Sequence, residues 1–153
     1  MIHREIEKLD PIIRDRARAF LETLKVLEFR FTVLETIREE SVQEAYYAQG
    51  REPVETVNSK RELAGLYPIS AAEAGRIITW TKYSRHIDGL ALDVAPLLPN
   101  GSIPWVIKDA SIAALWMSLG EVGERSGFAW GGRWKPLDDW GLGRDLPHFE
   151  VRK

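Results

Sequence analysis

The hydrophobic positions of this chain follow a helical period in two long stretches. Between residues 10 and 29, apolar side chains recur at helical spacing, and Asp10 followed by Pro11 is the favoured order for a helix start. Residues 108–126 repeat the pattern, with Trp116 among the periodic apolar positions. We therefore expect two amphipathic helices that pack on a core.

Three other segments are β-rich, and the end of the chain provides a fourth. Apolar runs and alternating patterns predict strands in FRFTVLE (Phe29–Glu35), RIITWT (Arg76–Thr81) and LALDVA (Leu90–Ala95). The last predicted strand is HFEV, which begins at His148. Helices and short strands in this order are typical of an α+β domain, so we expect a small, mostly antiparallel sheet flanked by helices.

The region between the first two predicted strands is less regular. A short helix is predicted at Ser41–Ala48, closed by Gly50 as a left-handed C-terminal residue. Residues 51–74 are polar and interrupted by proline and glycine, which indicates a long loop with one short helix near residues 59–66. Long connections of this kind are often functional, as the wall of a cleft or as a lid.

Composition narrows the class of protein. With 153 residues, 44% of them hydrophobic and 29% charged, the chain is typical of one globular domain. Its net charge is −2 and it has no run rich in lysine or arginine, so we expect no nucleic-acid partner. No window approaches the roughly 20 apolar residues of a membrane span, so we expect no membrane insertion. Residues 1–10 lack the apolar core of a signal peptide, which predicts synthesis in the cytoplasm, and we expect a monomer.

The candidate chemistry rests on histidine and carboxylate side chains, because the chain has no cysteine. His86 precedes Asp93 by seven positions, and Asp145 precedes His148 by three. Two imidazoles and one carboxylate leave a metal such as Zn²⁺ an open position for water, which is the layout of a catalytic site. A further carboxylate must take the proton of that water, and Asp145 is the candidate. On spacing alone, the alternative that these histidines are ordinary polar residues stays open.

Two blocks of sequence around these residues resemble the signatures of one family. SRHIDGLALD, residues 84–93, resembles the S-x-H-x-x-G-x-A-x-D signature of the D-alanyl-D-alanine and L-alanyl-D-glutamate metallopeptidases. DLPHFE, residues 145–150, resembles the second signature of the family, an acid two residues before Pro-His.

Two further blocks extend the resemblance over about residues 11–150. WGGRW, residues 130–134, is similar to the W-G-G-x-W block that phage endolysins of this type place ahead of the second signature. Arg38, Gln43 and the YAQGR stretch at residues 47–51 resemble the block R-x4-Q-x3-Y-A-Q-G-R. All four blocks occur in the order that the family has.

The resemblance implies a fold and a metal site. The family belongs to a wider group with the lysostaphin-type peptidases and the hedgehog signalling domain, so a hedgehog/D-Ala-D-Ala peptidase-like fold is expected. At matching positions, the zinc ligands of the family fall on His86, Asp93 and His148, and its general base falls on Asp145.

Three more residues receive expected roles. By the resemblance, Arg38 hydrogen-bonds the scissile carbonyl or the oxyanion that develops there. Ser84 lies near the metal, in contact with the site or with substrate. Trp130, like Trp134, is a candidate to line a groove for a glycan or peptide of the substrate, with packing in the core or cleft wall as the alternative.

The implied function is that of a zinc-dependent peptidoglycan endopeptidase, a phage endolysin that cleaves the L-Ala–D-Glu bond of the stem peptide. We expect residues 1–153 to form a single catalytic domain without a separate wall-binding module. It would act on host peptidoglycan in the periplasm after the membrane is permeabilised. A D,D- or L,D-carboxypeptidase that trims stem peptides and a non-catalytic zinc-binding module stay open as alternatives.

The chain departs from the family pattern in two places. Residues 135–144 are longer than expected and offer Asp138 and Asp139 as rivals to Asp145 for the role of general base. Residues 52–79 are enlarged, which leaves the choice of substrate open.

Overall fold

A four-stranded antiparallel sheet forms the centre of the computed structural model, which describes residues 1–152. The strands lie in the order β1-β2-β4-β3, and every neighbouring pair is antiparallel. All are short: β1 (Phe31–Glu35), β2 (Ala91–Pro96), β3 (Ala129–Trp130) and β4 (His148–Glu150). The expected α+β class with a small antiparallel sheet is therefore confirmed.

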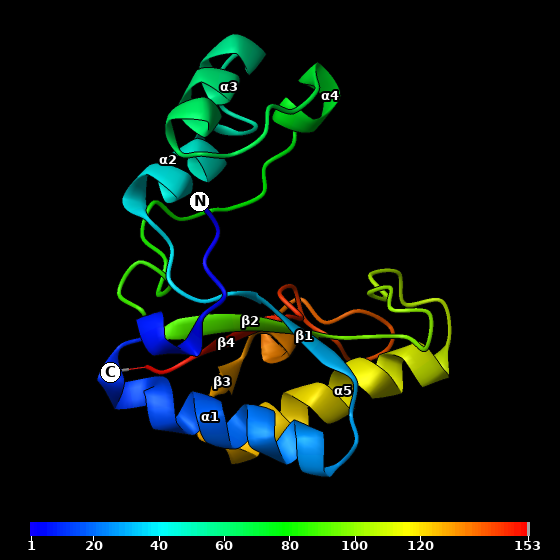
Figure 1. The fold of residues 1–153 in the computed structure, drawn as a ribbon. Coiled ribbons are helices and arrows are strands. Elements are labelled where there is room, and N and C mark those ends of the chain that lie inside the picture. Colours follow the sequence, from blue (N-terminus) through cyan, green and yellow to red (C-terminus); the bar gives the residue numbers. More distant parts are fainter. Residues whose placement is uncertain (153) are drawn as a thin grey trace.

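The helices form two groups on opposite sides of the sheet (Figure 1). The long helices α1 (Pro11–Val26) and α5 (Ala110–Arg125) cover one face. On the other side, α2 (Glu40–Ala48), α3 (Val54–Leu63) and α4 (Ala71–Ala74) form a separate group. Two 3₁₀ turns complete the fold, η1 (Ile6–Lys8) and η2 (Gly131–Arg133). Within the described residues, none of the helices combines the length and apolar character needed to cross a membrane.

Both long helices begin at a capping aspartate. The Asp10 carboxylate accepts a hydrogen bond from the backbone N–H of Ile12 at 2.8 Å, and Pro11 occupies the first helical position. Asp109 accepts from the backbone N–H of Ile112 at 3.0 Å in the same way. These caps satisfy backbone donors that the helix itself leaves without partners.

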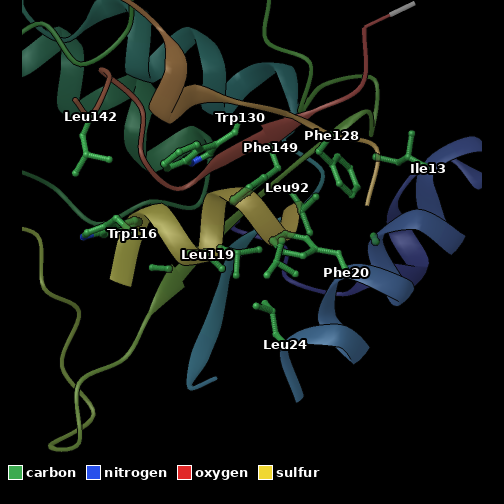
Figure 2. Close-up of a cluster of buried hydrophobic side chains, with 14 of the residues drawn as sticks. Ile13, Phe20, Leu24, Leu92, Trp116, Leu119, Phe128, Trp130, Leu142 and Phe149 are labelled. Carbon is green, nitrogen blue, oxygen red and sulfur yellow. The ribbon is translucent and has the colours of Figure 1, made fainter. Parts of the chain in front are cut away.

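The main core lies between the sheet and these two helices. Figure 2 shows Phe20 from α1 beside Phe149 from β4, and their ring centroids are 4.8 Å apart. On α5, Gly120 and Gly123 leave room for aromatic rings, because a Cβ atom at either position would lie within 2.3 Å of the ring of Trp130 or Phe149. The sheet and α5 therefore pack more closely than larger residues would allow.

The structure corrects the expected strand at Arg76–Thr81. This segment pairs with no strand among the described residues, and its large apolar side chains are exposed. Side chains from the α2 region hold its backbone instead: Gln43 donates to the carbonyl of Thr81 at 2.7 Å, and Arg51 donates to that of Thr79 at 3.0 Å. The β-rich composition thus yields an extended segment fixed by side chains and not a strand of the sheet.

The prediction of a long loop at residues 51–74 is also largely wrong. The region forms α3 and α4 and adds two small apolar clusters, in which Val57 and Ala64 are buried. Because α3 has only one buried residue within its bounds, it carries little of the apolar periodicity by which longer helices are recognised.

Candidate metal centre and active-site cleft

Strand pairing brings two of the candidate ligands together. Asp93 of β2 lies opposite His148 of β4 in the antiparallel register, although 55 residues separate them. Successive side chains of a strand point to opposite faces. Because Leu92 and Phe149 face the main core, Asp93 and His148 face away from it.

The third candidate ligand, His86, is placed by the turn that precedes β2. Gly89 has a φ of +68°, a conformation that other residues rarely adopt, and a Cβ atom there would lie 2.9 Å from the backbone nitrogen of Asp10. The Gly89 carbonyl accepts a hydrogen bond from that nitrogen at 3.0 Å. The carbonyl of His86 accepts one from the backbone of Arg38 at 2.9 Å. The turn is therefore fixed from two sides.

The three side chains converge on one point. His86 Nε2 lies 3.0 Å from Asp93 Oδ1 and 3.2 Å from His148 Nδ1, and the last two atoms are 3.2 Å apart. Two ligands about 2.0–2.1 Å from a tetrahedral zinc ion are about 3.3 Å from each other. The donor set and its spacing therefore fit such an ion, and the three residues form a group that could hold a metal.

Neighbouring groups orient both imidazoles toward this point. His86 Nδ1 lies 2.6 Å from the carbonyl oxygen of Thr36, which can only accept a hydrogen bond. His86 therefore carries its proton on Nδ1 and presents the lone pair of Nε2 to the centre. On the far side of the other ring, His148 Nε2 lies 3.0 Å from Glu150 Oε2. This contact turns the Glu150 side chain toward the site, and it matches the outer hydrogen bond that metal-binding histidines usually make.

The same contacts shift the ionisation of the group. Burial alone would raise the pKa of Asp93, but the imidazoles of His86 and His148 outweigh it and hold that pKa well below its usual value. Burial lowers the pKa of His148, whereas its hydrogen bonds to Asp93 and Glu150 raise it, and the net value is about 10. Burial, followed by the charge of Asp93, raises the pKa of Asp145.

A cleft of about 310 Å³ opens beside the three ligands. Its lining includes Arg38, Ser84, Trp134, Asp145 and His148. The structure thus brings the expected general base and the expected oxyanion-binding arginine to the same cavity as the ligands. Ser84 also belongs to the site, since its hydroxyl accepts a hydrogen bond from the backbone of His86 at 3.3 Å.

Asp145 lies three residues before the start of β4, where a turn and the WGG block hold it in place. The backbone N–H of His148 donates to the carbonyl of Asp145 at 3.2 Å, which closes a four-residue turn. Gly131 lies directly against this turn, because a Cβ atom at residue 131 would lie 2.2 Å from the Asp145 carbonyl oxygen. The Trp130 indole donates to the carbonyl of Leu146 at 2.7 Å. The WGG block therefore positions the acid.

We predict that Gly131→Ala lowers both stability and activity. The added methyl group must push the Asp145 turn away, and overpacking of this kind costs about 1–3 kcal/mol. Thermal unfolding and hydrolysis rates would measure the two effects. Gly75→Ala is the matched control, because a Cβ atom at residue 75 meets nothing closer than 3.6 Å. Equal loss in both variants would contradict this account of the block.

The two tryptophans of the WGGRW block differ in their surroundings, and Trp130 takes the alternative of packing in the core. Trp130 is 1% exposed and stacks on Phe149, so it packs in the core and does not contact the cleft. Trp134 lines the cleft, with its ring centroid 5.1 Å from that of His148. The rival acids Asp138 and Asp139 are exposed, and Asp138 caps a turn through the backbone N–H groups of residues 140 and 142.

A buried network that the sequence did not reveal fixes Arg38. Its guanidinium makes a two-point ion pair with Glu35, in which Nε donates to Oε1 at 2.9 Å and Nη2 donates to Oε2. Nη1 donates to Gln43 at 2.7 Å. A bulge between β1 and β2 places Glu35 opposite Asp93. A glutamate three residues before an arginine is common in sequences and does not by itself predict an ion pair at a site. The pairing of Glu35 with Asp93 is what brings this ion pair next to the metal ligands.

We predict that Glu35→Gln lowers turnover while zinc content stays unchanged. Removing one half of the pair frees the Arg38 side chain from its fixed geometry, and misplacement of such a group costs roughly 10²-fold in rate. Hydrolysis rates with metal analysis test this. Glu39→Gln is the control, since the Glu39 side chain is exposed and, within the part of the chain that the structure describes, pairs only with His3. A Glu35→Gln protein with full turnover would contradict a positioning role.

A family model described as D-alanyl-D-alanine carboxypeptidase matches residues 78–151, a segment that contains the three converging ligands and Asp145. The curated peptidoglycan L-alanyl-D-glutamate endopeptidase CwlK of Bacillus subtilis (strain 168) is 31% identical over 102 residues. The match covers 63% of this chain and 58% of that protein, so the chain spans somewhat more than half the length of this relative.

Two solved structures share the fold over almost the whole chain. The L-Ala D-Glu endopeptidase ChiX of Serratia marcescens has a TM-score of 0.53 at 21% identity. The superposed region covers 99% of this chain and 89% of ChiX. VanYB in complex with D-alanine-D-alanine has a TM-score of 0.57 at 18% identity, with 99% of this chain and 76% of VanYB covered. These likenesses confirm the expected D-Ala-D-Ala peptidase-like fold.

Proposed function

We propose that the chain is a peptidoglycan metallopeptidase of the D-alanyl-D-alanine carboxypeptidase family and that it hydrolyses a peptide bond in the stem peptide of peptidoglycan, an assignment that the matching family model and the similar endopeptidases support. One observation carries the proposal. His86, Asp93 and His148 converge beside a cleft that also contains an acid, Asp145, and a fixed cation, Arg38.

We propose zinc as the metal and these three residues as its ligands. Bound zinc supplies a Lewis acid that acidifies water and polarises the scissile carbonyl. Two imidazole nitrogens and one carboxylate oxygen suit this ion and leave one coordination position open. Thr36 and Glu150 support the assignment, because they hold the two rings in the orientation that metal binding requires.

Asp145 is proposed as the general base. It would take the proton of the attacking water and pass it to the leaving amine, and a carboxylate with a raised pKa is better suited to hold that proton. Asp145 lines the cleft and is partly shielded from bulk solvent.

Arg38 is proposed to bind the carbonyl oxygen as negative charge develops on it. Glu35 and Gln43 accept three of its hydrogen bonds, and a guanidinium has five N–H groups. Two donors therefore remain for the cleft, as far as the described residues show. Because the cation is already fixed, it needs little reorganisation during the reaction.

For the bond that is cut, we propose L-Ala–D-Glu. The relative CwlK and the structural neighbour ChiX are both named as endopeptidases of this specificity, which supports the assignment. Removal of a terminal D-alanine is the second candidate, favoured by the description of the family model and by the ligand of VanYB.

Digestion of defined muropeptides, followed by mass analysis of the products, separates these two reactions. Loss of L-Ala from the rest of the stem, with a new amino group on D-Glu, is the expected result. Release of free D-alanine would replace the endopeptidase assignment with a carboxypeptidase.

We also propose a biological role for this activity, namely lysis of a bacterial host. The resemblance of WGGRW and YAQGR to phage endolysin blocks supports a lytic role in which residues 1–153 act as a catalytic domain on host peptidoglycan. Added to permeabilised cells, the protein should then lower culture turbidity. Trimming of isolated stem peptides without lysis would argue against this role.

A further inference from the structure

A second hollow of about 570 Å³ lies along α2, and we call it the α2 groove. Most of the residues that line the α2 groove are charged. There are six of them: Glu40, Glu44, Arg51, Glu52, Lys60 and Lys82. None of these residues lines the cleft beside the metal ligands.

The α2 groove and the catalytic cleft share a wall. Thr81 lines the cleft, Lys82 lines the groove, and Tyr83 lines both. Arg51 reaches from the groove to this wall and donates to the carbonyl of Thr79, a cleft residue, at 3.0 Å. A ligand that extends out of the cleft past Tyr83 therefore enters the α2 groove.

The charges of the groove fall into two kinds. Glu52 and Lys60 form an ion pair at 3.1 Å. By contrast, Glu40, Glu44 and Lys82 have no ion-pair partner among the described residues, although all three line the same hollow. Glu40 and Glu44 are four residues apart on α2 and so lie on the same side of the helix. The groove therefore offers two unpaired anions along α2 and one unpaired cation, Lys82, beside the Tyr47 ring.

This arrangement suits an ionised ligand better than a neutral sugar. The Tyr47 ring, which a sugar could stack on, is covered by the Arg51 guanidinium at 3.9 Å and faces Lys82 Nζ at 5.1 Å. A neutral glycan would also desolvate the unpaired charges without compensating them. A ligand that carries both carboxylate and ammonium groups would pair with both kinds of charge.

We propose that the α2 groove binds the charged part of the stem peptide, namely the γ-linked D-glutamate and the diamino acid that follows it. This inference rests on the proposed function, in which these residues lie beyond the bond that is cut. Lys82 receives a carboxylate, and Glu40 and Glu44 receive the ammonium of the diamino acid. The nine residues of α2 extend over about 13.5 Å, which is long enough to lie beside both residues of this ligand.

The test uses the dipeptide γ-D-glutamyl-meso-diaminopimelate, which contains no bond for the proposed reaction to cut. Calorimetric titration into the zinc-loaded protein should show binding, and Lys82→Gln and Glu44→Gln should each weaken it by about fivefold, the effect of losing one partly exposed ion pair. Lys25→Gln on the exposed side of α1 is the control and should bind like the wild type. The same dipeptide with its carboxylates amidated should bind the wild type and Lys82→Gln equally.

Failure of the groove and failure of the proposed function are distinguishable. A wild type that does not bind the dipeptide, or binding that neither groove variant weakens, overturns the α2 groove assignment even if peptidoglycan is cleaved. A protein that binds the dipeptide through Lys82 and Glu44 but cleaves no peptidoglycan keeps the groove and loses the proposed reaction.

Discussion

Replacing His148 with alanine is expected to abolish zinc binding and peptidoglycan cleavage together. The side chain supplies one of three converging donors, and its Nδ1 lies 3.2 Å from both His86 Nε2 and Asp93 Oδ1. Two donors cannot hold zinc in a site of the kind that uses three protein ligands and water. Metal content measured by atomic absorption, together with release of new amino groups from peptidoglycan, would show both losses.

His3→Ala is the matched control for this prediction. His3 lies outside the cluster and contacts Glu39 and Lys8 instead. Its substitution should leave metal content and cleavage intact. A His148→Ala protein that still carries one zinc per chain would mean that the ion is held elsewhere.

Asp145→Asn is expected to separate the two properties that His148→Ala removes together. The amide keeps the shape of the side chain but cannot accept a proton, and loss of a general base lowers turnover by roughly 10²–10⁴-fold. Since Asp145 is not one of the three converging donors, zinc should stay stoichiometric. Turnover on a defined muropeptide, paired with metal analysis of the same sample, measures both.

Asp138→Asn tests the competing acid in the same loop. The Asp138 carboxylate is exposed and accepts hydrogen bonds from backbone N–H groups of its own turn, at 2.8 and 2.9 Å. Its replacement should cost little activity. If Asp138→Asn were inactive and Asp145→Asn active, the assignment of the base would have to move.

Sequence patterns were sufficient where local signals and packing agree. The capped, strongly periodic helices α1 and α5 follow from Asp10, Asp109 and the apolar stripes that contact the core. The motif spacing also identified a set of residues, His86, Asp93 and His148, that the structure brings within hydrogen-bond distance of one another.

The predictions that failed have a common physical cause. Each concerns a segment whose conformation or burial depends on residues distant in the chain. RIITWT has the composition of a strand, yet Gln43 and Arg51 occupy its carbonyls where a neighbouring strand would have been needed. Trp130 and Trp134 lie in one block and look alike in the sequence. Only the position of the sheet decides that the first is buried and the second lines the cleft.

The network around Arg38 depends on register in the same way. Glu35 reaches the site because the bulge in β1 changes its pairing, and such an irregularity leaves little trace in composition. The α2 groove likewise combines residues of α2 with a wall about 35 residues further along the chain, so its charges meet only in the folded protein.

Release of new amino groups from purified peptidoglycan, measured before chelation, after chelation and after zinc is restored, tests the central claim most directly. The account predicts release by the native protein, loss of release when the metal is removed, and recovery when zinc returns, with D-Glu as the new amino-terminal residue. Release that continues unchanged in the metal-free protein would contradict it.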